Sequence, residues 1–164
     1  MKKNMFIGLL AIVLVFGIMA VGCDNNITDC HLNGTWSYIY EWEDDDGQIH
    51  LFEAFLVLTN GSFELRDRSV KERGTYTTDN GILTLNLTHI FTFTNTWFVV
   101  QYGVAANRWY SKTELRNAFN MSDSEFEEEG LAEWLNDWFD EPMVFNYSID
   151  GNSLNLGGMV LTRK

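Results

Sequence analysis

The chain has 164 residues with 11 basic and 23 acidic side chains, a formal net charge of −12, one proline and two cysteines. This length fits one domain and a short extra segment, and the composition excludes the collagen-like, coiled-coil and disulfide-framework classes. The acidic balance excludes a nucleic-acid partner, because binding phosphates depends on Lys and Arg side chains.

The first 22 residues are predicted to be an export signal. Lys2 and Lys3 precede an uncharged apolar stretch over residues 5–21, and small residues lead to Cys23. The apolar stretch is shorter than the ~20 residues that a spanning helix requires, and no cluster of Lys or Arg follows it. A retained single-span anchor is therefore the less favoured alternative.

The segment Ala20-Val21-Gly22-Cys23 resembles the lipobox of bacterial lipoproteins. This resemblance implies cleavage before Cys23, a lipid carrying acyl chains such as palmitate on its sulfur, and anchoring to a membrane of the cell envelope. The protein would then lie on the periplasmic side or at the cell surface, with residues 23–32 as a tether. Lipidation would leave Cys30 without an intramolecular partner, so we expect an inert or occasionally intermolecular thiol there.

From Gly34 onwards, apolar and polar residues alternate with period two, which is typical of strands with one buried face. The predicted strands cover residues 34–42, 48–58, 62–66, 74–77, 82–93, 97–102, 144–149, 153–156 and 159–162. Asn60-Gly61 is a strong hairpin signal between two of them. The segment Asp44-Asp45-Asp46-Gly47 predicts an acidic turn; a calcium loop is disfavoured because Trp42 falls at the first ligand position.

Two capping boxes interrupt the strand pattern after Tyr102 and predict a helical insertion over residues 111–141. In Ser111…Glu114 and Ser122…Glu125, a hydroxyl and a carboxylate can satisfy each other's free backbone N–H groups. We expect two helices, one ending near Asn120 and one near Asp140. The acidic side chains of the second helix should face water: Glu127, Glu128, Glu129, Glu133 and Asp137. Trp134 and Trp138 should cover one end or flank of the sheet.

Eight or nine short strands joined mostly by tight turns predict a mainly β fold for residues 33–164. An antiparallel meander of this length removes its unpaired edges most simply by closing into an up-and-down barrel. The helical insertion would precede the last two or three strands.

Three short motifs resemble the bacterial lipocalin-like lipoproteins. The first is Gly34-Thr35-Trp36, the second is Gly74-Thr75-Tyr76-Thr77 together with the segment 81–85, and the third runs from Tyr147 to Leu154. The resemblance implies a lipocalin-like barrel in which Trp36 closes the base, with Arg163 stacked on its ring as a cation–π contact. Lipocalins place their main helix after the last strand, whereas this chain places helices before its last strands.

The residues that usually carry catalysis are few in this sequence. The only histidines are His31, His50 and His89, and we expect the last two to be strand residues on apolar faces. Nucleophile-elbow, zinc-protease, phosphate-loop and Cys-x-x-Cys motifs are missing from the sequence. We therefore expect a non-enzymatic protein without a metal or a cofactor, and a hydrolase is the remote alternative.

An unusual row of aromatic residues lies on one face of the first predicted strand: Trp36, Tyr38, Tyr40 and Trp42. They either pack the core, line a cavity for a small hydrophobic ligand, or form an exposed patch. Our hypothesis is a monomeric, membrane-anchored binding module for a small hydrophobic ligand or an envelope component. The alternative is a protein–protein interaction lipoprotein, such as an adhesin, an inhibitor or an assembly-associated protein, whose aromatic patch includes Trp134 and Trp138.

Overall fold

The computed structural model describes residues 29–43, 46–67 and 71–164 of the chain. In these residues, nine strands form one antiparallel sheet. The strands are β1 (Gly34–Glu43), β2 (Ile49–Thr59), β3 (Ser62–Arg66), β4 (Lys71–Asp79), β5 (Ile82–Thr92), β6 (Arg108–Ser111), β7 (Met143–Asp150), β8 (Ser153–Leu156) and β9 (Met159–Arg163).

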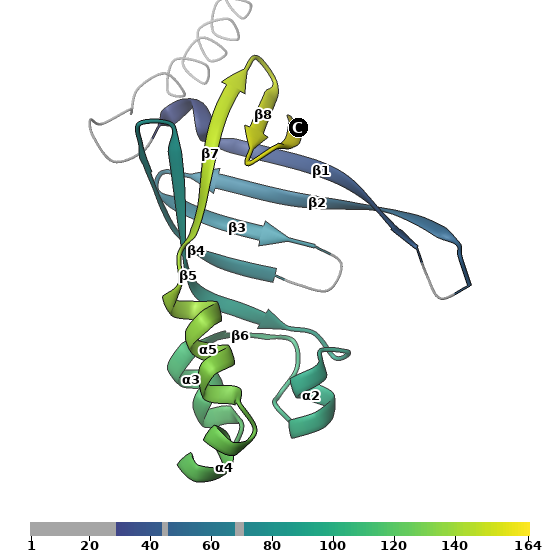
Figure 1. Ribbon diagram of the computed structural model, residues 1–164, viewed down its shortest axis with the longest axis vertical. Helices are drawn as coiled ribbons and strands as arrows, with labels where there is room; N and C mark the ends of the chain where they lie inside the picture. Colours follow the sequence, from purple (N-terminus) through teal and green to yellow (C-terminus); the bar gives the residue numbers. More distant parts are fainter. Residues whose placement is uncertain (1–28, 44–45, 68–70) are drawn as a thin grey trace, which may run out of the picture.

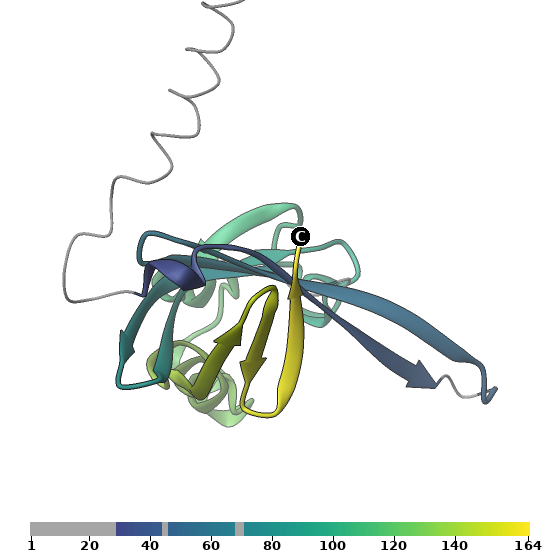
Figure 2. The ribbon, with the colours of Figure 1, turned by 90° about the horizontal axis from the view of Figure 1, so that it is seen from above.

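The sheet closes into a barrel (Figure 1, Figure 2). The strand order is β4-β3-β2-β1-β9-β8-β7-β5-β6, and a further pairing between β4 and β5 joins its two sides. Eight strands make the closed ring, and β6 pairs with β5 beyond the part of β5 that pairs with β7. Apart from β6, which lies between β5 and β7 in the chain, and the closing pair β1 and β9, neighbours in the ring follow one another along the chain. This order confirms the predicted mainly β, up-and-down antiparallel barrel.

Two Asn-Gly turns set the register of the hairpins. Asn60 and Gly61 have φ values of 46° and 82°, and Asn80 and Gly81 have values of 48° and 78°. Positive φ at both central positions is the mark of the tight turn that matches the twist of two strands, and Asn and Gly are the residues that adopt it at least cost.

A bulge between β4 and β5 changes which side chains of β5 point into the barrel. The register shifts between Arg73 and Gly74, and the hydroxyl of Thr88 donates to the carbonyl of Arg73 over 3.1 Å. A Cβ at Gly74 would lie 1.9 Å from the carbonyl oxygen of Asn86, so only glycine fits this crossing. After the bulge, Ile90 is buried instead of His89; the prediction that His89 shares the face of the preceding leucines is wrong.

The barrel is filled by apolar side chains from all parts of the ring. The buried strand residues are Trp36, Leu56, Leu58, Phe63, Tyr76, Leu83, Leu85, Leu87, Ile90, Leu154, Leu156 and Leu161. Most of them are leucine, and the large rings come from Trp36, Phe63 and Tyr76. The interior is thus a packed core, as small barrels commonly are.

The segment between β5 and β7 carries four helices and β6. The helices are α2 (Trp97–Tyr102), α3 (Lys112–Ala118), α4 (Asp123–Glu128) and α5 (Leu131–Asp140). They gather at the end of the molecule away from the short 3₁₀ turn η1 (Cys30–Leu32), as Figure 1 shows. Among the described residues, we find no helix that is both long and apolar enough to cross a membrane.

One predicted strand, over residues 97–102, is wrong because the structure places α2 there. Its residues favour strands by propensity, but the helix buries Phe98 against Phe119 and Trp134, and Gly103 ends it with a left-handed φ of 70°. Such a glycine commonly terminates a helix. Tertiary packing therefore outweighs local preference at this segment.

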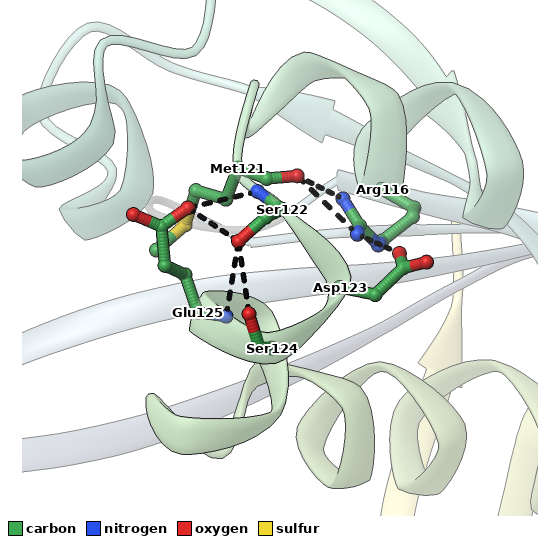
Figure 3. A network of polar contacts seen from close by, with 6 residues as sticks. All are labelled: Arg116, Met121, Ser122, Asp123, Ser124 and Glu125. Carbon is green, nitrogen blue, oxygen red and sulfur yellow. Dashed lines mark hydrogen bonds and ion pairs between the residues drawn. The ribbon is translucent and has the colours of Figure 1, made fainter.

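Both predicted capping boxes are present, and Figure 3 shows the second. The Ser122 hydroxyl accepts from the backbone N–H of Glu125 over 3.3 Å, while the Glu125 carboxylate accepts from the N–H of Ser122 over 2.9 Å. Arg116 of α3 forms an ion pair with Asp123 and donates to the carbonyl of Met121, which holds α3 and α4 together.

The prediction of two helices in the insertion is wrong in number. Residues 111–141 contain three helices, α3, α4 and α5, and α2 precedes them. The predicted second helix is divided into α4 and α5 by Gly130, whose φ is 70°. A left-handed residue cannot continue a right-handed helix, so the chain turns there. The acidic side chains of this region are exposed, as predicted.

Candidate functional site

The base of the barrel is built around Trp36. This indole is fully buried, its N–H donates to the carbonyl of Leu32 over 2.7 Å, and the guanidinium carbon of Arg163 lies 4.4 Å from the centre of its ring. Arg163 also donates to the carbonyl of His31. The predicted cation–π contact between Trp36 and Arg163 is therefore observed, and it closes this end of the barrel together with η1.

The outer part of the β1–β2 hairpin extends beyond the barrel (Figure 1, Figure 2). We call residues 39–43 and 49–53 the arm. In the described residues, β9 pairs with β1 only at Trp36 and Ser37, and β3 pairs with β2 only from Phe55 onwards. The arm is thus a two-stranded ribbon with backbone edges that no described strand covers.

One face of the arm is aromatic. The ring centres of Trp42 and His50 are 5.6 Å apart, those of Tyr40 and Phe52 are 5.7 Å apart, and those of Trp42 and Phe52 are 6.4 Å apart. The hydroxyl of Tyr40 donates to the carboxylate of Asp67, just after β3, with O–O distances of 2.8 and 2.9 Å. This contact braces the aromatic face against the barrel.

The opposite face of the arm alternates aliphatic and acidic residues. Ile39, Ile49 and Leu51 are 60%, 64% and 66% exposed. Across the two strands, each of them lies opposite a glutamate, in the pairs Ile39–Glu53, Leu51–Glu41 and Ile49–Glu43. The exposed apolar side chains therefore recur along one projecting ribbon and are not scattered singly over the surface.

The four aromatic residues predicted as one row on β1 separate in space. Trp36 is in the barrel core, Tyr38 is half-buried beside it, Tyr40 belongs to the arm, and Trp42 is 50% exposed further along the arm. Their alternation along the strand is as predicted. They do not come together around one cavity, however, because the strand leaves the barrel at its middle.

Trp134 and Trp138 on α5 belong to an aromatic cluster between the helices and the barrel. Trp134 lies 5.3 Å from Trp97 and 4.8 Å from Trp138, measured between ring centres. Both residues of α5 are half-buried, and the indole N–H of Trp138 donates to Glu72 of β4 over 2.8 Å. The predicted cover of one barrel end by these tryptophans is thus observed.

A cavity of about 290 Å³ lies where β4 and β5 meet α2 and α5. The residues that shape it include Lys71, Phe91, Asn95, Trp97, Phe98 and Trp138. Its walls are aromatic, while Lys71 and Asn95 add polar groups. The volume is at the small end of the range for ligand pockets in proteins.

Glu72 is a buried carboxyl next to this region, with only 6% of its surface exposed. Burial raises its pKa because a charged carboxylate loses its hydration, and the hydrogen bond from Trp138 opposes this increase. Sequence reasoning missed Glu72 because the predicted strand began at Gly74. Extending the alternation of Tyr76 and Gly74 two residues further back would have placed it on the inner face.

His50 and His89 lie in strands, as predicted, although His89 does not share the face of the preceding leucines. His50 stacks on Phe52 with ring centres 6.1 Å apart, and a ring nitrogen of His89 lies 3.0 Å from the Thr88 hydroxyl. Asp29, Cys30 and His31 bring ligand-type atoms within 4.8 Å of one another. There the Asp29 carboxylate caps η1 by accepting from the His31 N–H over 2.9 Å, so its first role is structural.

Cys30 is disulfide-bonded. The expectation of an unpaired thiol is therefore wrong for this residue. The only other cysteine of the chain is Cys23, and it lies outside the described residues together with the export signal and the lipobox. The tip of the acidic turn, Asp44 and Asp45, lies outside them as well.

Comparisons of the chain with protein-family models, with curated proteins and with solved structures found no match. The fold itself defines the class of the protein: an antiparallel up-and-down β-barrel with a helical insertion and a projecting hairpin.

Proposed function

We propose that this protein is a non-enzymatic interaction module of a bacterial cell envelope and that the arm docks a partner protein. The observation that carries the proposal is the exposure of Ile39, Ile49, Leu51 and Trp42 on a ribbon that projects from an otherwise packed barrel. Exposing these side chains to water is costly, and covering them in a complex would recover that free energy.

The charge of the arm favours a basic partner. Glu41 and Glu43 stand between the aliphatic side chains, and Glu53 already forms an ion pair with Lys164, whose Nζ lies 2.6 Å from Oε1. A partner surface with apolar sockets and Lys or Arg beside them would complement this pattern. A second copy of this chain would bring like charges together, and an anionic lipid surface would repel them.

The anchor of the module is proposed from the sequence. The lipobox resemblance at Ala20 to Cys23 supports a lipid on Cys23, which would hold the barrel at a membrane of the cell envelope. A thioether to lipid and a disulfide exclude each other on Cys23, since each uses the same sulfur. The anchor thus requires Cys30 to be reduced, or paired with another molecule, in the lipidated protein.

A lipocalin-like classification is also a proposal. It is supported by the motifs that carry the resemblance, by the up-and-down order of the ring, and by the stacking of Arg163 on Trp36. Ligand binding inside the barrel is less favoured than docking by the arm, because large side chains such as Trp36, Phe63 and Tyr76 occupy the interior.

Photo-crosslinking in a bacterial host tests the docking proposal. A photoreactive phenylalanine derivative replaces Ile39 or Leu51 on the arm, and Val144 or Val160, which are 58% and 56% exposed on the barrel, serve as matched controls. We expect the arm positions to give an adduct with one identifiable basic protein. The barrel positions should give no such adduct.

Binding of the identified protein is then measured with purified components. Ile39→Asn with Leu51→Asn should weaken it at least 10-fold, Val160→Asn should leave it unchanged, and added salt should weaken it because charges contribute. Equal adducts at arm and barrel positions, or adducts with lipid alone, would contradict the proposal.

Metabolic labelling with palmitate tests the anchor separately. Label should enter the wild-type protein and Cys30→Ser but not Cys23→Ser. A mature protein whose intact mass shows Cys23 without lipid would overturn the lipoprotein assignment, while leaving the docking proposal intact.

A further inference from the structure

The cavity between the end of the barrel and the helices is lined by a combination of side chains that packing alone does not explain. It combines aromatic walls from β5, α2 and α5 with one ammonium group, that of Lys71 on β4. The Nζ atom of Lys71 lies 5.1 Å from the centre of the Phe91 ring. In the part of the chain that the structure describes, no carboxylate forms an ion pair with it.

This isolation of Lys71 is unusual for the molecule. Acidic residues outnumber basic ones by about two to one, and the other described lysines, Lys112 and Lys164, are paired with Asp140 and Glu53. Glu72 is its neighbour in sequence, but successive side chains of a strand point to opposite faces, and Glu72 accepts from Trp138 instead. The cavity therefore contains a cation whose charge no described carboxylate balances.

The aromatic walls are held in place before any ligand arrives. The Trp138 ring is fixed by its hydrogen bond to Glu72, and Trp97 packs edge-on against Trp134 and Tyr102 with ring centres 5.3 and 5.5 Å apart. Rigid walls lower the entropic cost of binding. The amide of Asn95 adds a polar group that can donate a hydrogen bond.

We propose that this cavity binds a small aromatic or aliphatic carboxylate, with the apolar body between Trp97, Phe98 and Trp138 and the carboxylate at Lys71. A cationic ligand is disfavoured by the charge of Lys71. A phosphate group would require more than one cation or a cluster of donors, and a volume of about 290 Å³ suits a ligand of one or two rings. This site is separate from the arm.

The test is a titration of the full mature chain with three probes of one shape and different charge. The probes are 2-naphthoate, the neutral 2-naphthalenemethanol and the cationic 2-naphthylmethylammonium, and binding is measured by calorimetry and by tryptophan fluorescence. We expect 2-naphthoate to bind at least 10-fold more tightly than the neutral probe, with the cationic probe weakest. Added salt should reduce the difference.

Variants assign the charge preference to Lys71. Lys71→Met should lower the affinity for 2-naphthoate to that of the neutral probe and leave the neutral probe unchanged, whereas Lys71→Arg should restore the preference. Lys112→Met is the matched control, since Lys112 is paired with Asp140 at another cavity, and it should have no effect.

Three results would overturn the assignment. They are the lack of saturable binding of 2-naphthoate at 1 mM, equal affinities for the three probes, or equal effects of Lys71→Met and Lys112→Met. None of them bears on the docking of a partner by the arm, because the probes and the variants do not involve it.

Discussion

The two halves of β1 carry the same alternation of side chains but lie in different surroundings. In the inner half, Trp36 has neighbouring strands on both sides, η1 beneath it and Arg163 over its ring. In the outer half, Trp42 has only β2 as a neighbour and is half exposed. One strand therefore contributes to the core at one end and to the surface at the other.

This comparison shows that an aromatic row in a strand does not identify a core or a binding face by itself. Its role depends on how far the neighbouring strands run beside it. β9 and β3 are short, so the outer residues of the longer β1 and β2 remain uncovered. The inner half should determine stability, and the outer half should be available for binding.

The largest expected effect separates the two tryptophans. Trp36→Ala should lower the free energy of unfolding by about 3–5 kcal/mol, because it removes a fully buried ring and leaves a cavity. Trp42→Ala should lower it by less than about 1 kcal/mol, since the ring is half exposed. Urea denaturation measures both, and similar losses would disprove the division of β1 into a core half and a surface half.

The next effect concerns the guanidinium over Trp36. Arg163→Met should cost about 1–2 kcal/mol, because it removes a partly buried cation–π contact and the donor to the His31 carbonyl. Arg66→Met is the control: Arg66 forms a surface ion pair with Glu64, and its loss should cost less than about 0.5 kcal/mol. Thermal melting measures both losses. Equal losses of stability in the two variants would contradict the role of Arg163.

A smaller effect is expected in the helical insertion, which lies apart from both halves of β1. Ser122→Ala removes the hydroxyl that caps α4 and should cost about 1 kcal/mol. Ser122→Asp keeps an acceptor at the cap and should retain most of the stability. Circular dichroism during urea unfolding measures the difference; a Ser122→Ala protein as stable as the wild type would show that the cap contributes little.

The smallest effect is a change in pH dependence at Glu72. Burial raises its pKa above the value of 4.5 for a free side chain, so the folded protein holds this proton more tightly than the unfolded chain. Stability from this group is therefore full below pH 4.5 and decreases as pH rises through the raised pKa. Glu72→Gln should remove that decrease and still accept from Trp138.

Unfolding curves between pH 4 and pH 8 measure this prediction. Glu72→Gln should match the wild type near pH 4 and exceed it at pH 8, while Glu41→Gln on the exposed arm should follow the wild-type curve. If Glu72→Gln lost stability at pH 8, the charged carboxylate would be a net stabilising group instead.

Much of the fold follows from local patterns in the sequence. The alternation from Gly34 predicted eight of the nine strands, because a half-buried strand needs period two. The turn at Asn60-Gly61 and both capping boxes were recognisable, since each depends on residues only one to three positions apart.

The candidate sites were less accessible to sequence reasoning. Trp36, Tyr40 and Trp42 were identified as one row, but their division between core and arm depends on where β9 and β3 end. The cavity combines Lys71, Phe91 and Trp138, which are far apart in the chain and meet only when α5 packs on the barrel. The residues of α2 resembled a strand until the packing of Phe98 was known.

The sequence by itself determined the barrel class, its hairpin turns and the helix caps, because these depend on short-range periodicity and on recognisable motifs. The Trp36–Arg163 contact was expected only from the lipocalin-like resemblance. Only the tertiary structure decided the bulge at Thr88, the helix at residues 97–102, the projecting arm and the position of Lys71 beside the aromatic cavity. These features arise from contacts between distant segments, and the free energy of such contacts exceeds the small local preferences that a sequence displays.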